Sequence, residues 1–424
     1  MITGENAPPA ITRGQIFGVT LGNALEFYDF LVFSFFAVQI GQCFFPATNP
    51  QSSLLLALAT FGAGFLTRPI GAVVIGGLGD RIGRRPMMLL SFAMIGLSTL
   101  GVAITPSYAA IGLAAPVIVI LCRLVQGFAL GGEVGTSTAF LAEAAPEAKR
   151  GRYISLQFAG QGASTLLAGL IGVSLAAAMS DAALASWGWR VAMAVGAATV
   201  PVGLALRRTL PETLHPDVSA TEAPPFRNYA SVAAFGFITM LSATIATYVL
   251  NYMTTFAKVT LGMSSGVSLG ATVAVGLGNL IGSLMGGVLA DRHGRRPWMI
   301  WPMTIGAISV MPGFWLLTSF PSAATLYAVS FLLRLTLSIA ATSAFIAITE
   351  LLPARVRSGT LSIVYAVAIS IFGGSTQFVI AWLTGLTGNP LAPAWYMFGA
   401  ALLGVAAMAF ARETAPAKTT LVPV

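Results

Sequence analysis

The string "GLGDRIGRRP" at residues 77–86 returns as "VLADRHGRRP" at residues 288–297. A second string, "FLAEAAPEAKRG" at 140–151, returns more loosely as "AITELLPARVRSG" at 347–359. The two pairs are separated by nearly the same length of chain. Near-equal separations are typical of internal duplication, so we predict two copies of one structural unit.

Composition tells what kind of unit is duplicated. Of the 424 residues, 56% are hydrophobic and only 8% are charged, against roughly a quarter charged in ordinary soluble domains. Apolar stretches of about 20 residues, each long enough to cross ~30 Å of hydrocarbon, recur along the chain. They predict twelve helices: 15–40, 53–79, 87–105, 111–142, 153–177, 188–207, 230–257, 267–290, 298–318, 323–350, 359–384 and 393–411.

The longest polar interruption separates the sixth and seventh of these helices. We therefore expect an all-α membrane protein with twelve transmembrane helices in two pseudo-symmetric six-helix bundles. The first bundle covers 1–207, a cytoplasmic linker covers 208–228, and the second bundle covers 229–424.

The net charge of +8 does not indicate a nucleic-acid partner, because the basic residues are distributed by loop. Seventeen of the 22 lysines and arginines lie in the termini and even-numbered loops, and only Arg190 and Lys258 lie in the odd-numbered ones. By the positive-inside rule this pattern predicts a multi-pass protein of the inner (plasma) membrane with both termini cytoplasmic.

Six charged residues lie inside the predicted helices. Each costs about 2.5–3.5 kcal/mol if it faces lipid without a partner, so these side chains must face the interior. Counted at 1.5 Å per residue, Glu26, Arg123 and Arg334 reach a similar depth near the midplane. The six are Glu26, Asp29, Glu133, Arg68, Arg123 and Arg334.

Several strings resemble one known family. D-R-x-G-R-R after the second and eighth helices is similar to the signature of the major facilitator superfamily. Within it, "GNALEFYDF" at 22–30, "RLVQGFALGGEVGTS" at 123–137 and "WGWR" at 187–190 resemble the metabolite:proton symporters. Gln157 with Gln161, and Asn279, look most similar to citrate and tricarballylate carriers. Other strings look equally like the α-ketoglutarate carriers, so the resemblance leaves the carboxylate open.

A central anion site at the interface of the repeats is typical of such transporters. We expect Arg123 and Arg334 to bind substrate carboxylates, because guanidinium groups bind carboxylates in bidentate geometry. An ion pair of Arg123 with Glu26 or Asp29, and an interhelical ion pair of Arg334, remain as alternatives. Arg334 also departs from the pattern expected of citrate carriers, which leaves an altered anion preference open. The other expected substrate contacts are Asn23, Tyr28, Gln126, Gln161 and Asn279.

Glu26 and Asp29 are the candidates for proton coupling, because burial and mutual repulsion disfavour two charges on one helical turn. An ion pair with Arg123 that only joins helices is the alternative. Glu133 is included as a coupling residue, although a gate or ion-pair role suits its position better. For Arg68, we favour a structural role.

The resemblance implies that the aspartates and arginines of the repeated loops hold the two bundles together on the cytoplasmic side. The expected gate residues are Asp80, Arg81, Arg84, Asp291, Arg292 and Arg295. A simpler interpretation is that these basic turns only orient the helices in the membrane.

Other functions fit less well. The predicted membrane interior contains no histidine, no nucleophile with a base and no metal cluster, so we expect no enzyme, no metal and no cofactor. Because there is no G-x-x-x-x-G-K-[ST] motif for ATP, transport must use an ion gradient. We expect a monomer that carries a citrate-like di- or tricarboxylate with protons; sodium coupling and proton-driven export remain alternatives.

Overall fold

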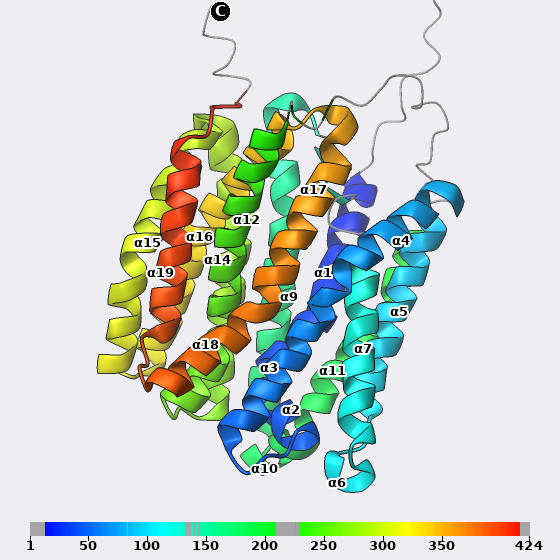
Figure 1. Cartoon of the computed structure of the whole chain (residues 1–424), viewed down its shortest axis with the longest axis vertical. Helices are drawn as coiled ribbons and strands as arrows, with labels where there is room; N and C mark the ends of the chain where they lie inside the picture. Colours follow the sequence, from blue (N-terminus) through cyan, green and yellow to red (C-terminus); the bar gives the residue numbers. More distant parts are fainter. Residues whose placement is uncertain are drawn as a thin grey trace, which may run out of the picture.

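The computed structural model describes residues 13–82, 84–131, 137–138, 141–142, 145–208, 225, 227 and 229–415. All the regular secondary structure in these residues is helical. In Figure 1 the helices stand side by side in one bundle, with the early spans on one side and the late spans on the other.

The first half of the chain supplies six spans. The first is α1 (Arg13–Phe35) with α2 (Ala37–Phe44), and the second is α3 (Pro50–Leu66) with α4 (Arg68–Ile82). The other elements of this half are α5 (Arg84–Ile104), α6 (Tyr108–Ile111), α7 (Ala114–Leu130), η1 (Glu147–Lys149), α9 (Arg150–Ala178), α10 (Asp181–Ala183), η2 (Leu184–Gly188) and α11 (Trp189–Arg208).

The second half repeats the arrangement after the linker. Its elements are α12 (Ala230–Asn251), α13 (Met253–Thr255), η5 (Phe256–Thr260), α14 (Ser265–His293), α15 (Arg295–Ser319), α16 (Ala323–Leu351), α17 (Ala354–Ala368), η6 (Ile369–Gly373), α18 (Gly374–Thr387) and α19 (Ala392–Ala409). Each predicted span corresponds to a helix in this order, which confirms the twelve-helix fold class. The division into domains at 207 and 229 stays a prediction.

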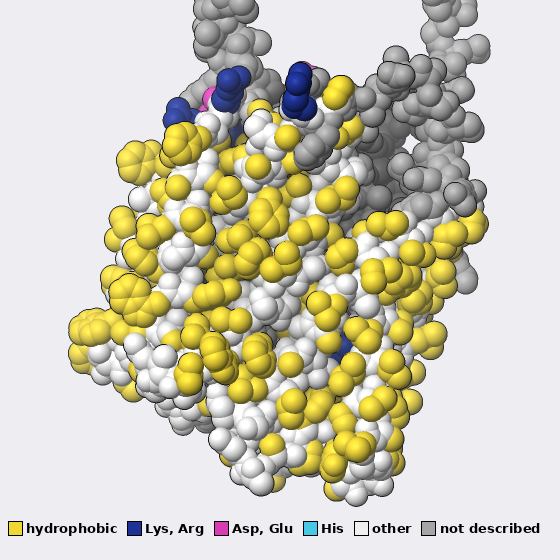
Figure 2. All heavy atoms as spheres, in the orientation of Figure 1, with side chains coloured by type: hydrophobic (Ala, Val, Ile, Leu, Met, Phe, Trp, Pro, Cys, Tyr) yellow, Lys and Arg dark blue, Asp and Glu magenta, His cyan; other side chains and the backbone are white. Residues whose placement is uncertain are grey.

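Nine helices of the described residues are long and apolar enough to cross a membrane, and Leu89–Ile104 and Ala114–Leu130 are shorter apolar helices. Large apolar side chains cover the outside of the bundle: Val73 is 76% exposed and Leu97 is 71% exposed. Figure 2 shows this apolar surface, with most of the visible Lys and Arg side chains gathered at the end that carries the C-terminus. We call this the terminal end; the other, which carries α6 and α10, is the opposite end.

The second span is interrupted at one residue, and the interruption positions a buried arginine. The helix breaks at Thr67, next to the Arg68–Pro69 pair. Proline lacks a backbone N–H and restricts the residue before it, so a break here is expected. The Thr67 hydroxyl donates to the carbonyl of Leu124 at 2.7 Å, which fixes the break against α7.

Glycines let helices of the same half approach closely. A Cβ on Gly127 of α7 would lie only 1.4 Å from the carbonyl oxygen of Gly64 in α3. In the second half, Gly278 and Gly282 of α14 pack on the backbone of α16 in the same way. Small residues at helix contacts are the usual means of close packing in membranes. The four-residue glycine spacing of α7 and α14 therefore serves packing within each half.

The two halves meet most extensively along α9 and α14. Gly162 and Gly169 of α9 lie against the backbone of α14, and Gly276 of α14 lies against the backbone of α9. At the opposite end the halves also meet through α3 and α18, where Gly62 faces the carbonyl of Gly374. Both contacts between the halves thus place backbone against backbone.

The α7–α3 contact makes a direct prediction. Gly127→Ala should cost about 1–3 kcal/mol or more, because the added methyl overlaps the Gly64 carbonyl. Thermal unfolding in detergent would measure this. Gly399→Ala is the matched control: it is also helical, and nothing lies within 4 Å of its added methyl. Equal unfolding midpoints for the two variants would contradict the packing assigned to Gly127.

Candidate functional site

A cavity lies among α1 and α9 of the first half and α12, α14, α16 and α17 of the second. Most of its wall is apolar, but polar side chains converge on it from several helices. The chemically informative ones are Gln161, Tyr248, Asn279, Arg334, Ser338 and Tyr365. An apolar pocket with a few placed polar groups is typical of small-molecule sites.

Arg334 supplies the charge in this cavity. It comes from the middle of α16 and is 7% exposed. Its Nη1 donates to the hydroxyl of Thr247 at 2.7 Å, while its Nε has no hydrogen-bond partner in the structure. Within the described residues no ion pair includes Arg334, so the interhelical ion pair considered from the sequence is not formed. A buried guanidinium with a free N–H is suited to bind an anion.

Two amide side chains add polar groups to the wall. The Asn279 oxygen accepts from the Ser338 hydroxyl at 2.8 Å, and its nitrogen donates to the carbonyl of Phe158 at 3.4 Å. Asn279 therefore connects α14 to α16 and to α9. Gln161 of α9 brings an Nε2 that has no hydrogen-bond partner. Together with Arg334 these groups can donate several hydrogen bonds to one ligand.

Asn23 and Tyr28, which we expected to contact the substrate, bond to neighbouring helices of the first half. Asn23 exchanges two hydrogen bonds of 3.1 Å with Gln157 of α9. The Tyr28 hydroxyl donates to the carbonyl of Ala192 in α11 at 2.9 Å. Both fasten α1 to neighbouring helices of the same half, and neither lines the cavity. From this turn it is Phe27 that lines it.

Arg123 is also separate from the cavity wall. Its Nη1 donates to Gln126, and Gln126 donates in turn to the Thr99 hydroxyl at 2.6 Å. Gln126 therefore positions Arg123 within the first half. Among the described residues no ion pair joins Arg123 to Glu26 or Asp29, so the purely structural alternative is not supported by the structure.

The two acids of α1 are buried in the first half. Glu26 is 1% and Asp29 is 2% exposed. Asp29 faces α11, where Gly196 leaves room for its Oδ1, and this oxygen has no hydrogen-bond partner. Holding a charge there is costly. Neither acid lines the cavity, and Glu133 lies outside the described residues.

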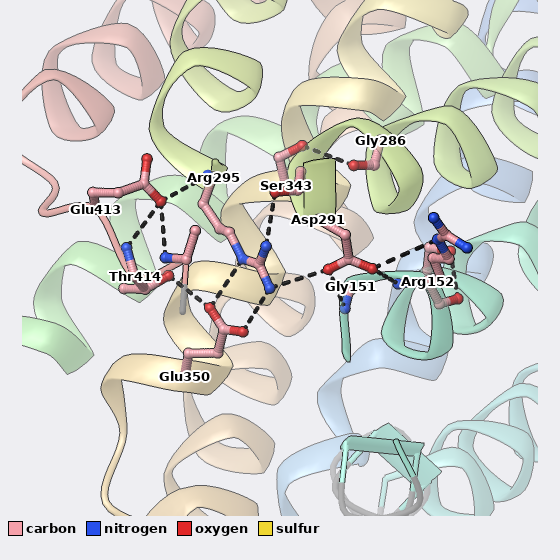
Figure 3. Close-up of polar contacts among 12 residues, drawn as sticks. Gly151, Arg152, Gly286, Asp291, Arg295, Ser343, Glu350, Glu413 and Thr414 are labelled. Atoms are coloured by element: carbon pink, nitrogen blue, oxygen red, sulfur yellow. Dashed lines mark hydrogen bonds and ion pairs between the residues drawn. The ribbon is translucent and has the colours of Figure 1, made fainter. Parts of the chain in front are cut away.

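A network of charged groups lies at the terminal end, centred on Arg295 (Figure 3). Arg295 is 1% exposed. Its guanidinium binds the Glu350 carboxylate with two bonds, Nε to Oε2 at 3.1 Å and Nη2 to Oε1 at 2.9 Å. Nη2 also lies 3.1 Å from Asp291 Oδ1. Arg295 thus joins the repeated loop after α14 to the end of α16.

Asp291 carries this network across to the first half. Its two carboxylate oxygens accept the backbone N–H groups of Gly151 and Arg152 at 2.9 and 3.0 Å. These donors begin α9, where unpaired N–H groups and the helix dipole favour an anion. A Cβ on Gly151 would clash with the Asp291 carboxylate. The bond is therefore a contact between the two halves that requires glycine.

Glu413 closes the network after α19. Partial burial alone would raise its pKa, but backbone N–H groups of Arg295, Ala415, Arg296 and Thr414 donate to it and hold the pKa of Glu413 below its usual value. The stability from these bonds is present above the unfolded-state pKa and is lost as pH falls through the lowered one.

The other expected gate residues are either exposed or have side chains outside the described residues. Arg292 is exposed beside the network. The side chains of Asp80, Arg81 and Arg84 lie outside the described residues. Two loops carry the repeated motif. The structure describes a contact between the halves for the second of them, through Asp291. No group of three or more His, Cys, Asp or Glu residues that could hold a metal occurs in the part of the chain the structure describes.

Sequence reasoning missed the aromatic side of the cavity. Tyr248 and Tyr365 line it together with Thr247, and Tyr248 also contacts Phe61 and Phe65 of α3. A tyrosine in an apolar helix gives a weak signal, because it looks like an ordinary core residue. Tyr248 is distinguished from an ordinary core residue only by the contact of its ring with α3, which the sequence does not reveal.

Comparison with known proteins gives relatives along nearly the whole chain. Residues 16–215 match the family model described as "Sugar (and other) transporter". The chain is 36% identical to a citrate-proton symporter of Salmonella typhi over 412 residues, which covers 95% of each protein. It is also 36% identical to the α-ketoglutarate permease of Escherichia coli K12 over 388 residues, covering 90% of this chain and 89% of the permease.

Solved structures agree on the fold. The proton:xylose symporter XylE, a protein of the major facilitator superfamily, superposes with a TM-score of 0.77 at 20% identity, covering 95% of this chain and 96% of XylE. At this identity the likeness concerns the fold alone. It matches the twelve-helix arrangement predicted from the repeat.

The Asp291 contact generates a prediction. Asp291→Asn removes the charge that Arg295 and the start of α9 share, and bonds to charged groups contribute about 1.5–3 kcal/mol each. We expect a lower unfolding midpoint in detergent and slower substrate exchange, with little change in equilibrium affinity, since the network is remote from the cavity. Arg292→Gln, at an exposed neighbour, should change stability by no more than about 0.5 kcal/mol. A large loss of affinity with normal exchange would argue against a gate at Asp291.

Proposed function

This chain belongs to the major facilitator superfamily, and we propose that it carries an organic anion with two or three carboxylates across the membrane together with protons. Full-length relatives at 36% identity are a citrate-proton symporter and an α-ketoglutarate permease. We infer a substrate of the same chemical class, with citrate-like anions first and α-ketoglutarate second.

One observation carries this proposal: the buried guanidinium of Arg334 in a cavity between the halves. A cation without a carboxylate partner is expensive in a membrane interior and is a functional-site signal there. An entering carboxylate supplies the missing partner, and Gln161 and Asn279 add hydrogen-bond donors or acceptors around it. A neutral sugar would leave the charge of Arg334 uncompensated, so the cavity favours an anion.

Proton coupling is assigned to the acids of α1. Asp29 is buried with one oxygen lacking a partner, so its environment favours gaining a proton. Glu26 lies one turn away on the same helix and is equally buried. A proton taken from outside and released inside would let the gradient drive accumulation. Glu133 remains a weaker candidate for this role. No cofactor is proposed, and sodium is the alternative coupling ion.

Alternating access uses the two kinds of contact between the halves. At the opposite end the halves meet through α3 and α18, and at the terminal end Asp291 binds the start of α9. We propose that the terminal end is cytoplasmic, in an inner membrane, and that the chain works as a monomer. Each end opens in turn while the other stays closed, exposing Arg334 to one side at a time.

The proposal is tested by uptake into proteoliposomes under an imposed inward pH gradient. Radiolabelled citrate and α-ketoglutarate are supplied in turn, with xylose as a neutral control. We expect at least one carboxylate to accumulate and a protonophore to abolish that accumulation. Xylose should not accumulate. A sodium gradient at constant pH tests the alternative ion. If neither carboxylate accumulates under either gradient, the proposed function fails.

Arg334 gives the first prediction from this function. Arg334→Ala should reduce carboxylate uptake to background, and Arg334→Lys should recover little of it because the bidentate geometry is lost. Equilibrium binding of citrate and α-ketoglutarate to purified protein separates affinity from transport rate. Wild-type affinity for both anions in Arg334→Ala would remove this residue from the site.

The acids of α1 give the second prediction. Glu26→Gln or Asp29→Asn should abolish gradient-driven accumulation but retain downhill exchange, which needs no net proton movement. Glu147→Gln, at an exposed acid on η1, is the matched control and should leave both activities unchanged. Loss of accumulation and exchange together in both α1 variants would mean that these acids hold the fold and do not couple protons.

A further inference from the structure

Two arginines of the first half share one aromatic ring. The guanidinium carbon of Arg68 lies 4.4 Å from the centroid of Phe30, and that of Arg123 lies 4.3 Å from the same centroid. The distance between the two cations therefore cannot exceed the sum of these values. Phe65 also contacts Arg68, and Phe61 contacts Arg123. The result is an aromatic box that holds two positive charges.

These cations are not paired. Arg68 is 4% and Arg123 is 0% exposed. Nε and Nη2 of both arginines have no hydrogen-bond partner, and within the described residues neither arginine belongs to an ion pair. Stacking on aromatic rings offsets only part of this cost, since a desolvated cation–π contact contributes about 2 kcal/mol. Two like charges this close also repel each other.

Arg190 shows what a structural stacked arginine of this chain looks like. Its guanidinium carbon lies 4.5 Å from the ring centroid of Trp189, and its Nη1 donates to the carbonyl of Ala103 at 2.6 Å. Its side chain is thus stacked and also hydrogen-bonded to the backbone. Arg68 and Arg123 are stacked in the same manner but keep free N–H groups. Their free donors are what a carboxylate would use.

Tyr248 lies between this box and the cavity. Its ring packs on Phe65 at 5.5 Å and on Phe61 at 6.1 Å, between centroids, and it also lines the cavity of Arg334. Phe65 also stacks on Arg68, Phe61 also stacks on Arg123, and Arg334 lines the same cavity as Tyr248. Tyr248 therefore connects the two arginines of the first half to the arginine of the second.

We propose that Arg68 and Arg123 form a second carboxylate subsite, reached from the cavity when the Tyr248 ring moves. This inference rests on the proposed function and deepens it. One carboxylate of the substrate binds Arg334 in the second half, and another binds Arg68 and Arg123 in the first. Only an anion with at least two carboxylates bridges the halves, so the subsite selects polycarboxylates and links their binding to closure around them.

Binding of radiolabelled citrate and α-ketoglutarate to purified protein in nanodiscs tests the subsite. Arg68→Gln and Arg123→Gln should each weaken citrate binding about tenfold or more, which is about 1.4 kcal/mol. A comparable loss is expected for α-ketoglutarate, because its two carboxylates also occupy both positions. Arg190→Gln is the matched control, a stacked arginine away from Tyr248, and should stay within about twofold of wild type.

A second variant covers the case in which Arg68→Gln does not fold. Arg68→Lys keeps a stacked cation, which is enough for a structural role, but loses the forked geometry that binds a carboxylate. We expect it to fold and still lose citrate affinity several-fold. Wild-type citrate affinity in Arg68→Lys together with wild-type affinity in Arg123→Gln would overturn the subsite.

The outcomes separate the two proposals. If Arg334→Gln loses binding while the Arg68 and Arg123 variants bind as wild type, the subsite is wrong and the proposed function stands. If wild-type protein binds neither anion, the proposed function fails and the subsite fails with it. Equal losses in the Arg68 and Arg190 variants would also overturn the subsite, because both would then act only through the fold.

Discussion

Uncompensated positive charge in a low-dielectric interior is the constraint on which this molecule depends. Arg68, Arg123 and Arg334 are buried without carboxylate partners in the described structure. The chain tolerates them by stacking aromatic rings on two and bonding the third to Thr247. A bound anion would offset the remaining cost, so neutralising these charges should contribute to the binding free energy of a polycarboxylate.

A single helix can contain residues that line the cavity and residues that attach it to neighbouring helices. In α1, Phe27 faces the cavity while Asn23 and Tyr28 fasten the helix to α9 and α11. In α14, Asn279 lines the cavity, the glycines lie against α9 and α16, and Asp291 reaches the start of α9. Because one rigid helix performs all three tasks, movement at the terminal contact is transmitted to the cavity wall without an additional linkage.

Much of the fold was predictable because the hydropathy pattern and the repeated loop motif are long-range signals. The twelve spans follow from them. Arg334 follows from its charge and depth, and Gln161 and Asn279 follow from the resemblance to citrate carriers. Side-chain direction does not: Phe27 lines the cavity, whereas the adjacent Tyr28 lies on another face of the helix and bonds to α11. The surroundings of Arg68 were not predictable for a related reason. Its partner ring, Phe30, lies in α1, and Tyr248 lies in α12. No residue spacing in the sequence predicts that these helices meet near Arg68.

The contact of α3 with α18 sets how the opposite end responds to temperature. Gly62 and Gly374 meet there through their backbones, and Gln51 donates to the carbonyl of Ala381 at 2.8 Å. Leu54 and Leu58 of α3 also pack in one apolar cluster with Ile380 and Ala381 of α18, so separating the two helices hydrates hydrocarbon as well as peptide groups. Exposing apolar area raises heat capacity and exposing polar area lowers it. Opening at this end of the carrier should therefore have a positive heat-capacity change, and its equilibrium should follow a curved van't Hoff plot.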